Sequence, residues 1–454
     1  MSIIALQKTL LEEWIGKKIG IQSDLLTREQ ISLYQLEKLR TTIGWAYQNS
    51  PFYRMMWKDI DAVKLNCLQD LERFPFITAK HLKEQALQLL CVSQSEIHRI
   101  VTLDSSGTTG NPKRIYFTAA DQELTIDFFQ QGMSSMLTAG DRVLILLPGE
   151  RIGSIGDLLK VALKRAGARP IPHGIVTNLS ETLKTIVRQG VDCLVGIPSQ
   201  VLALARYTEF TGQGISLKSI LLSTDHVPYS IIEELKRVWN CQVFEHYGMT
   251  EMGLGGGLDC MAHAGYHLRE ADLYFEIIDS NGKLAPEGQT GEVVFSTLTR
   301  QGMPLIRYRT GDISRFIPEP CPCGTLLRRM EPVRNRKSSV VFLADQSCFT
   351  LADLDEKLFA VPEVIDFTVA VDNMRHTTQL KITVWILGES KERINSEILI
   401  ALKALPNLEQ ARLAGSLSIS IDINRDTAIH VPNPAKRKIV ELKKTDGKSD
   451  NLFE

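Results

Sequence analysis

Short apolar runs that alternate with helical stretches constrain the fold of this chain more than any other feature. The runs at 143–147, 193–197 and 219–223 are largely aliphatic, and each is followed by a stretch with helical periodicity. Such a run is typical of a strand that is buried on both faces. Strands that alternate with helices form right-handed βαβ crossovers, so the sequence predicts an α/β fold with a mainly parallel sheet.

The pattern changes twice further along the chain. Short segments at 273–278, 291–295 and 312–316 are separated by turn residues, which predicts an antiparallel, barrel-like region. The order strand, helix, two strands, helix, strand then predicts a compact α+β unit. We therefore expect a large N-terminal domain over residues 1–336 and a small C-terminal lid domain over residues 337–454.

Length and charge exclude several classes of protein. The 454 residues exceed one ordinary hydrophobic core, and the formal net charge of −1 gives no electrostatic reason to bind nucleic acid. No apolar stretch is long enough to span a membrane. Residues 1–14 mix charged with apolar side chains, as an amphipathic helix does and a signal peptide does not. We expect a cytoplasmic protein that binds neither nucleic acid nor membranes.

A loop rich in glycine and hydroxyl side chains lies at residues 104–113. Its polar and flexible members are Ser105, Ser106, Gly107, Thr108, Thr109, Gly110 and Lys113. The backbone N–H groups, the hydroxyls and the lysine of such a loop can surround a phosphate. The two glycines are too close together for a Walker A loop. Taken alone, the cluster is also typical of an ordinary turn.

Three further motifs follow the loop. They are Glu-His-Tyr-Gly-Met-Thr-Glu at 245–251, Tyr-Arg-Thr-Gly-Asp at 308–312, and Pro-Asn-Pro-Ala-Lys-Arg-Lys at 432–438. Each alone also fits a solvated loop or a basic turn. In this order, together with the 104–113 loop, they resemble the adenylate-forming superfamily of acyl-CoA synthetases, adenylation domains and luciferases. The resemblance is greatest to the phenylacetate–CoA ligase and coenzyme F-390 synthetase branch.

The resemblance implies a reaction and its participants. A small carboxylic acid, with aryl acids among the candidates, attacks the α-phosphate of ATP and pyrophosphate leaves. The acyl group of the adenylate then passes to CoA. The implied cofactors are ATP, Mg²⁺ and CoA, and because some relatives dimerise a homodimer is a further expectation.

The resemblance also implies the residues that act. It places phosphate at Thr250, Mg²⁺ at Glu251 and adenine against Tyr247. It places the ribose at Asp312 and assigns Lys436 to the first half-reaction. The full set is the loop residues above with Tyr247, Gly248, Met249, Thr250, Glu251, Asp312, Arg336 and Lys436.

The sequence departs from the family at two places. Ala435 replaces the usual glycine before Lys436, which bears on the assignment of that lysine in the first half-reaction. Ser338 and Ser339 replace the acidic pair of the interdomain hinge, which bears on thioester formation. An enzyme that stops at the adenylate, or uses an acceptor other than CoA, is therefore an alternative. A nucleotide-binding protein without catalysis is a third hypothesis.

Two other features complete the predicted sites. Cys260, His267, Cys321 and Cys323 follow the spacing C-x₆-H and C-x-C-G, which predicts a tetrahedral structural Zn²⁺ site, with His263 as an alternative fourth ligand. Four unrelated buried residues are the other interpretation. By resemblance the acyl pocket is lined from near 196–199, 223–225 and 252–257, where the glycine-rich run either admits a bulky acid or forms a tight turn.

Overall fold

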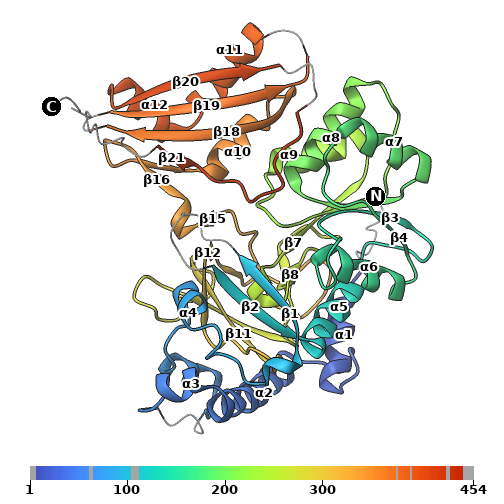
Figure 1. The fold of residues 1–454 in the computed structure, drawn as a ribbon, viewed down its shortest axis with the longest axis vertical. Coiled ribbons are helices and arrows are strands. Elements are labelled where there is room, and N and C mark those ends of the chain that lie inside the picture. The colour runs from blue at the N-terminus through green and yellow to red at the C-terminus, as the bar shows by residue number, and fades with distance from the viewer. Residues whose placement is uncertain are drawn as a thin grey trace, which may run out of the picture.

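The computed structural model describes residues 7–60, 65–103, 112–374, 377–388, 391–425 and 430–442. Within these ranges a large N-terminal domain carries a smaller C-terminal domain on one side (Figure 1). The fold is α/β with a parallel sheet, an antiparallel sheet and a separate C-terminal sheet, as the sequence predicts. None of the helices in the described ranges combines the length and the apolar character that crossing a bilayer requires.

The largest described sheet has nine strands and contains the predicted parallel run. The apolar runs form β3 (Arg142–Leu146), β5 (Cys193–Gly196) and β6 (Ser219–Leu222), which lie side by side and parallel. The other members are β4 (Arg169–Pro172), β7 (Gln242–Tyr247), β8 (Gly257–Leu258), β9 (Tyr266–Leu268), β13 (Phe316–Ile317) and β14 (Arg329–Met330).

Alternate residues of these strands enter two different cores, because side chains alternate across a strand. Leu144, Leu194 and Ile220 share one core with α7 (Leu179–Gln189), α8 (Pro198–Phe210) and α9 (Tyr229–Trp239). Their neighbours Val143, Cys193 and Leu221 pack on the opposite face. That face is covered by α1 (Leu10–Ile19), α5 (Ala119–Ser134) and α6 (Ile155–Arg165). Helices on both faces explain why these strands are apolar on both sides.

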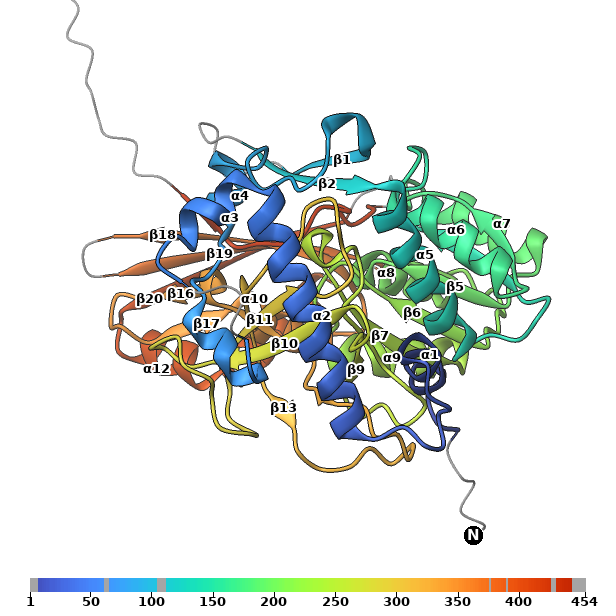
Figure 2. The same ribbon diagram turned by 90° about the horizontal axis from the view of Figure 1, so that it is seen from below.

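A four-stranded antiparallel sheet forms the predicted barrel-like region. It contains β10 (Leu273–Ile278), β11 (Gly291–Thr297), β12 (Tyr308–Ser314) and β15 (Asn335–Arg336). The hairpin of β1 (Ile97–Leu103) and β2 (Lys113–Thr118) lies beside it. Figure 2 shows α2 (Arg28–Asn49) running across this part of the molecule. The remaining short helices are α3 (Pro51–Met56), η1 (Leu68–Arg73), α4 (Ala79–Glu84), η2 (Gln94–Glu96) and η3 (Thr250–Met252).

Within the described residues, the first helix begins later than the sequence predicts. The sequence predicts an amphipathic helix over residues 1–14, whereas α1 begins at Leu10. Thr9 caps it, because its side chain accepts a hydrogen bond from the N–H of Leu11. Residues 1–6 lie outside the described ranges. The apolar pattern therefore predicted a helix in this region, but it did not indicate that Thr9 caps the helix and sets where it begins.

The C-terminal domain follows the predicted order and adds short elements to it. After η4 (Lys337–Ser339), the predicted elements are β16 (Val340–Phe342), α10 (Leu351–Leu358), β18 (Val364–Asn373), β19 (Thr378–Ile386), α11 (Lys391–Lys403) and β20 (Leu417–Asn424). The sequence did not indicate β17 (Cys348–Thr350), α12 (Pro406–Leu413) or β21 (Val440–Glu441). The domain boundary after residue 336 stays a prediction.

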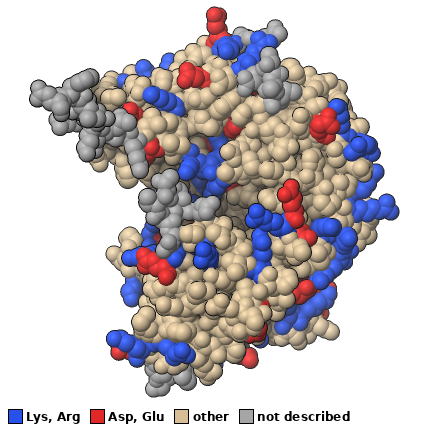
Figure 3. Space-filling view, viewed as in Figure 1, with Lys and Arg blue, Asp and Glu red and all other residues tan. Residues whose placement is uncertain are grey.

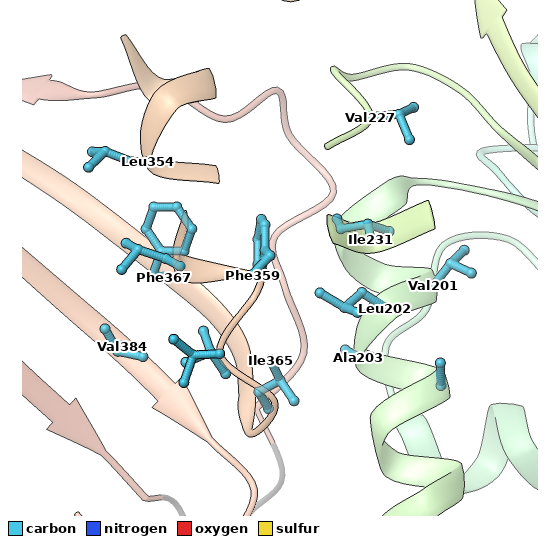
Figure 4. Packing of buried hydrophobic residues seen from close by; sticks show 14 of the residues in the cluster. Val201, Leu202, Ala203, Val227, Ile231, Leu354, Phe359, Ile365, Phe367 and Val384 are labelled. Atoms are coloured by element: carbon cyan, nitrogen blue, oxygen red, sulfur yellow. The ribbon is translucent and has the colours of Figure 1, made fainter. Parts of the chain in front are cut away.

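The two domains share one apolar core. The cluster that contains Leu202 and Ile231 of the large domain also contains Phe359 and Ile365 of the C-terminal domain (Figure 4). Buried Arg206 on α8 reaches across the boundary, donating to the backbone carbonyls of Val364 and, at 2.6 Å, Phe359. The C-terminal domain is therefore docked by packing as well as by polar contacts.

Candidate active site

The predicted phosphate loop is only partly within the described residues. Ser105, Ser106, Gly107, Thr108, Thr109 and Gly110 all lie outside the described residues, so their roles stay predictions. The strands on either side pair in antiparallel register, with Leu103 opposite Lys113. Lys113, the last member of the predicted set, lies at the start of β2.

Lys113 forms an ion pair with Glu251, which is 138 residues away in the sequence. The hydroxyl of Tyr308 donates to the same carboxylate oxygen, Oε1, at 2.8 Å. Burial alone would raise the pKa of Glu251, but the charge of Lys113 and the hydrogen bonds from Lys113 and Tyr308 lower it overall. Glu251 is therefore an ionised carboxylate at neutral pH, although it is 1% exposed.

Asp312 forms the second half of this polar network. The hydroxyl of Tyr247 donates to its Oδ2 at 2.9 Å, and Nε of Arg336 lies 2.5 Å from its Oδ1. Gly311, at φ +77°, occupies the left-handed region that favours glycine, so the chain can bend just before the carboxylate. The motifs at 245–251 and 308–312, with Arg336, therefore meet at one place.

The turn after β7 positions the residues between Tyr247 and Glu251. A Cβ on Gly248 would lie 2.4 Å from the carbonyl oxygen of Leu254, so only glycine fits there. Met249 precedes η3, which contains Thr250 and Glu251. Tyr247 stacks on Tyr266 with ring centroids 5.8 Å apart and planes at 19°. The predicted adenine contact of Tyr247 stays a prediction.

Lys436 brings the C-terminal domain into this network. Its side chain is exposed, and charged groups of the large domain act on it. Figure 3 shows basic side chains gathered around a hollow, the crevice, between the two domains. Partial loss of hydration, and then the charge of Arg336, lower the pKa of its amine, while Asp225, Asp312 and Glu251 act in the opposite direction. The last motif therefore lies within electrostatic reach of the second and third.

Neighbours of Lys436 fix its segment to both domains. The N–H of Arg437 donates to Oδ2 of Asp225 at 3.2 Å, and its guanidinium pairs with Asp355. The carbonyl of Pro432 accepts from Gln200 on α8 at 2.8 Å. This arrangement holds Lys436 at the crevice, where its amine can neutralise developing negative charge.

An apolar pocket lies between α5, α6 and the carboxyl ends of β5, β6 and β7. The predicted segment at 223–225 contributes Ser223, but α5 and α6 supply most of the wall, and the sequence did not indicate them. His246 also lines the pocket, although it was noted only as part of the 245–251 motif. Ligand sites at the carboxyl ends of parallel strands are a general property of such sheets.

The predicted metal ligands converge at a second place. Sγ of Cys260 and Cys321 are 3.8 Å apart, and Sγ of Cys323 is 3.6 Å from Nε2 of His267. The four buried ligand atoms lie within 4.8 Å of one another. A tetrahedral Zn²⁺ with bonds of about 2.3 Å to sulfur and about 2.0 Å to nitrogen would separate its ligands by roughly 3.5–3.8 Å. The residues present therefore fit the ion.

The alternative ligand, His263, is engaged elsewhere. Its Nδ1 lies 2.6 Å from Oδ2 of Asp259, and its Nε2 lies 3.2 Å from the side-chain oxygen of Gln242. It is absent from the group of four converging ligand atoms in the described chain.

Glu12 of α1 accepts hydrogen bonds from Thr325 and from the N–H of Leu326, which anchors the turn after Cys323.

Comparison with known proteins agrees with this geometry. Residues 84–299 match the model of the AMP-binding enzyme family. The phenylacetate–coenzyme A ligase of Thermus thermophilus is 26% identical over 438 residues, which cover 91% of this chain and 95% of the relative. The enzyme of the same name from Pseudomonas putida is 29% identical over 73% of this chain and 76% of its own. Over most of its length this chain is therefore similar to AMP-forming phenylacetate–coenzyme A ligases.

Solved structures extend the likeness to the whole fold. A 2-hydroxyisobutyryl-CoA ligase in its postadenylation state matches 92% of this chain and 91% of its own with a TM-score of 0.75 and 19% identity. The same enzyme in its thioesterification state covers 92% of this chain with a TM-score of 0.65. The fold is therefore that of adenylate-forming ligases, including both domains.

Proposed function

We propose that this chain is an AMP-forming acid–CoA ligase. It activates a carboxylic acid as the acyl-adenylate, releases pyrophosphate and then forms the acyl-CoA thioester. The observation that carries the proposal is the convergence of Lys113, Glu251, Asp312 and Lys436, from four distant segments and both domains, on one crevice. The names of the phenylacetate–coenzyme A ligases that match most of the chain support it.

In the first half-reaction the protein mainly supplies charge and position. The carboxylate of the acid attacks the α-phosphorus of ATP and the bond to pyrophosphate breaks. Lys436 neutralises charge on the acid and the α-phosphate, Asp312 accepts from the ribose hydroxyls, and Lys113 with the 104–111 loop binds the leaving phosphates. The ionised Glu251 is a suitable oxygen ligand for Mg²⁺, which when bound neutralises phosphate charge.

For the second half-reaction we propose that the C-terminal domain rotates about residues 337–339 and admits CoA. The higher TM-score to the postadenylation form than to the thioesterification form is consistent with an adenylating arrangement here. Residues 337–339 form a short 3₁₀ turn, η4, between the two domains.

A second candidate function is transfer of the acyl group to an acceptor other than CoA, or release of the adenylate itself. The shared interdomain core and the contacts of Arg206 favour it, because rotation of the C-terminal domain would break them. Ser338 and Ser339 in place of the hinge acids point the same way.

Three finer features belong to this proposal. We propose structural Zn²⁺ at Cys260, His267, Cys321 and Cys323, where bound metal would contribute folding free energy. An aryl acid remains a substrate candidate because Phe128 and Phe129 line the pocket. A cytoplasmic location and a homodimer stay predictions.

Acid-dependent exchange of labelled pyrophosphate into ATP tests the first half-reaction, with and without CoA. Acid-dependent exchange together with a CoA thioester, detected by mass spectrometry, would support the ligase. Accumulation of adenylate without thioester would favour the second candidate. ATP binding without exchange across a broad panel of aryl and short aliphatic acids would contradict both.

A further inference from the structure

Helix α9 of the large domain has no side-chain cap from its own N-terminal segment. Pro228 occupies the N-cap position and offers no side-chain acceptor to the N–H groups of Tyr229 and Ser230, the first two residues of the helix. The first N–H groups of a helix have no partner within the helix and carry the positive end of its dipole. A carboxylate placed there would satisfy both the hydrogen bonds and the charge.

The carboxylate that caps α9 comes from the other domain. Oε1 of Glu356, on α10, accepts the N–H of Tyr229 at 2.9 Å, and Oε2 accepts the N–H of Ser230 at 3.2 Å. Arg334 also donates to Oε1 at 2.9 Å, but its side chain is 51% exposed, so this ion pair contributes little. The two charge-assisted hydrogen bonds to α9 therefore carry most of the polar contact.

The residue next to Glu356 holds the segment that contains Lys436. Asp355 pairs with the guanidinium of Arg437, which also donates to the carbonyl of Phe367 at 3.0 Å. The same guanidinium lies 4.8 Å from the ring centroid of Phe359 and 4.3 Å from that of Phe367. The side chain of Arg437 is thus fixed within the C-terminal domain by α10 and its neighbours.

The backbone of Arg437 contacts the large domain instead. Its N–H donates to Oδ2 of Asp225 at 3.2 Å, and Lys436 is the residue just before it. Ile231 of α9 and Phe359, just after α10, share the apolar core at the boundary (Figure 4). The position of α10 against α9 therefore determines whether Lys436 lies at the crevice.

We propose that Glu356 is a positioning residue for the first half-reaction. By capping α9 across the domain boundary it holds α10, and through Asp355 and Arg437 it holds Lys436, in the adenylating arrangement. The inference rests on the proposed ligase function, in which the C-terminal domain rotates between the two half-reactions. Rotation would break the cap, so Glu356 favours the first half-reaction over the second.

A two-state equilibrium between the adenylating and rotated arrangements gives a measurable consequence. Each half-reaction proceeds in proportion to the share of molecules in its own arrangement. The ratio of the two rates then follows the equilibrium constant, whichever arrangement dominates. Removal of a capping side chain changes such an equilibrium by about three- to tenfold.

The two half-reactions can be measured separately in Glu356→Ala and in the unaltered protein. Acid-dependent pyrophosphate exchange reports the first, with the acid of the aryl and short aliphatic panel that exchanges fastest. Thioester formation from the synthetic adenylate of that acid and CoA reports the second. We expect the ratio of thioester formation to exchange to rise by about three- to tenfold. A merely structural role would lower both rates and leave their ratio unchanged.

Hydrogen exchange of backbone amides gives a readout that needs no substrate. The Arg437 N–H is held by Asp225 only while the domains are docked, and Glu356 does not touch it. In Glu356→Ala this amide should exchange about three- to tenfold faster, together with the amides of Tyr229 and Ser230. A purely local cap would accelerate exchange at Tyr229 and Ser230 alone.

Two further variants serve as comparisons. Glu356→Gln keeps an accepting oxygen but loses the charge, so its rate ratio should lie between those of the unaltered protein and Glu356→Ala. Glu397→Ala is the matched control. Glu397 is a partly exposed glutamate of the same domain, and it pairs with Arg393 within its own helix, α11. Its removal should leave the rate ratio and the exchange of the Arg437 amide unchanged.

Two results would overturn the inference. An unchanged rate ratio in Glu356→Ala would show that the cap does not bias the two half-reactions. Unchanged exchange at the Arg437 amide would show that Glu356 does not hold the C-terminal domain. Absence of both reactions in the unaltered protein would overturn the ligase function and the catalytic part of this inference. The amide exchange would then still decide whether Glu356 docks the domain.

Discussion

The charged crevice and the cysteine cluster are both built from distant segments, but they are built differently. The crevice takes residues from both domains, and Lys436 within it is exposed. The cysteine cluster takes all four side chains from the large domain, and all four are buried. The crevice therefore depends on how the domains are placed, while the cluster depends only on the folding of one domain.

This difference distinguishes residues that affect turnover from residues that affect folding stability. Changes in the crevice should alter turnover with little effect on folding. Changes in the cysteine cluster should lower the stability of the fold and affect turnover only through that loss.

The double substitution Cys321→Ser and Cys323→Ser should have the largest effect. It removes two of the four proposed zinc ligands, and loss of a metal site can cost more than about 4 kcal/mol of folding stability. Denaturant unfolding of metal-replete protein measures the change. Cys67→Ser, at an exposed cysteine, is the control. Unchanged stability, or less than about half an equivalent of zinc by elemental analysis, would contradict the structural site.

Lys436→Ala should cause the largest loss of turnover. Loss of one charge that stabilises a developing anion typically lowers turnover by about 10²–10³-fold, which is about 3–4 kcal/mol. Exchange kinetics measure the loss, and thermal unfolding should be unchanged because the side chain is exposed. Lys438→Ala, two residues away and also exposed, should retain most activity. Full exchange in Lys436→Ala would remove this residue from the mechanism.

Glu245 lies on β7 between the two regions and should link stability to pH. Burial, and then the charge of Asp259, raise its pKa to about 8. Its carboxyl group ionises near its usual pKa in the unfolded chain, so between that value and 8 the folded chain binds more protons. Stability therefore falls as pH rises through this window, by about 2 kcal/mol after allowance for partial exposure.

Glu245→Gln cannot ionise and should flatten this part of the pH–stability profile. Urea unfolding at pH 5, 6, 7 and 8 measures it. Glu233→Gln, whose side chain is 51% exposed on α9, should retain the wild-type slope. A slope that persists in Glu245→Gln would assign the titration to another group.

Asp312→Asn should have the smallest effect. The amide still accepts one hydrogen bond but loses the charge that faces Arg336 and the predicted ribose, so KM for ATP should rise by about tenfold, or about 1.4 kcal/mol. Steady-state exchange at varied ATP measures this. Asp59→Asn is a matched control because its side chain is 85% exposed. An unchanged KM would separate Asp312 from nucleotide binding.

Periodicity predicted most of the fold because the central strands are buried on both faces and are therefore continuous aliphatic runs. It missed β17 and β21, which are too short to show a period, and α12, whose apolar residues are few. Periodicity also does not predict how the two domains pack against each other. Arg206 could have been noticed as a lone arginine in an apolar helix, but its partners come from the backbone of another domain.

The site was predicted in its parts and not in its contacts. The motifs identified Glu251 and Asp312, but the pairing of Glu251 with Lys113 joins residues 138 positions apart and requires the fold. The Cys/His spacing predicted the cluster and left either His267 or His263 as the fourth ligand. The contacts of His263 with Asp259 favour His267. His246 lies within a recognised motif, and the sequence did not indicate that it lines the apolar pocket.

The apolar core between the domains has a consequence for the life of a reactive product. Swinging the C-terminal domain away would wet the faces that carry Ile231 and Phe359, and hydrating such surfaces is unfavourable. The resting molecule thus favours the closed form, in which an acyl-adenylate would be shielded from hydrolysis. Binding of CoA to the rotated form would supply the free energy that separates the apolar faces of the two domains.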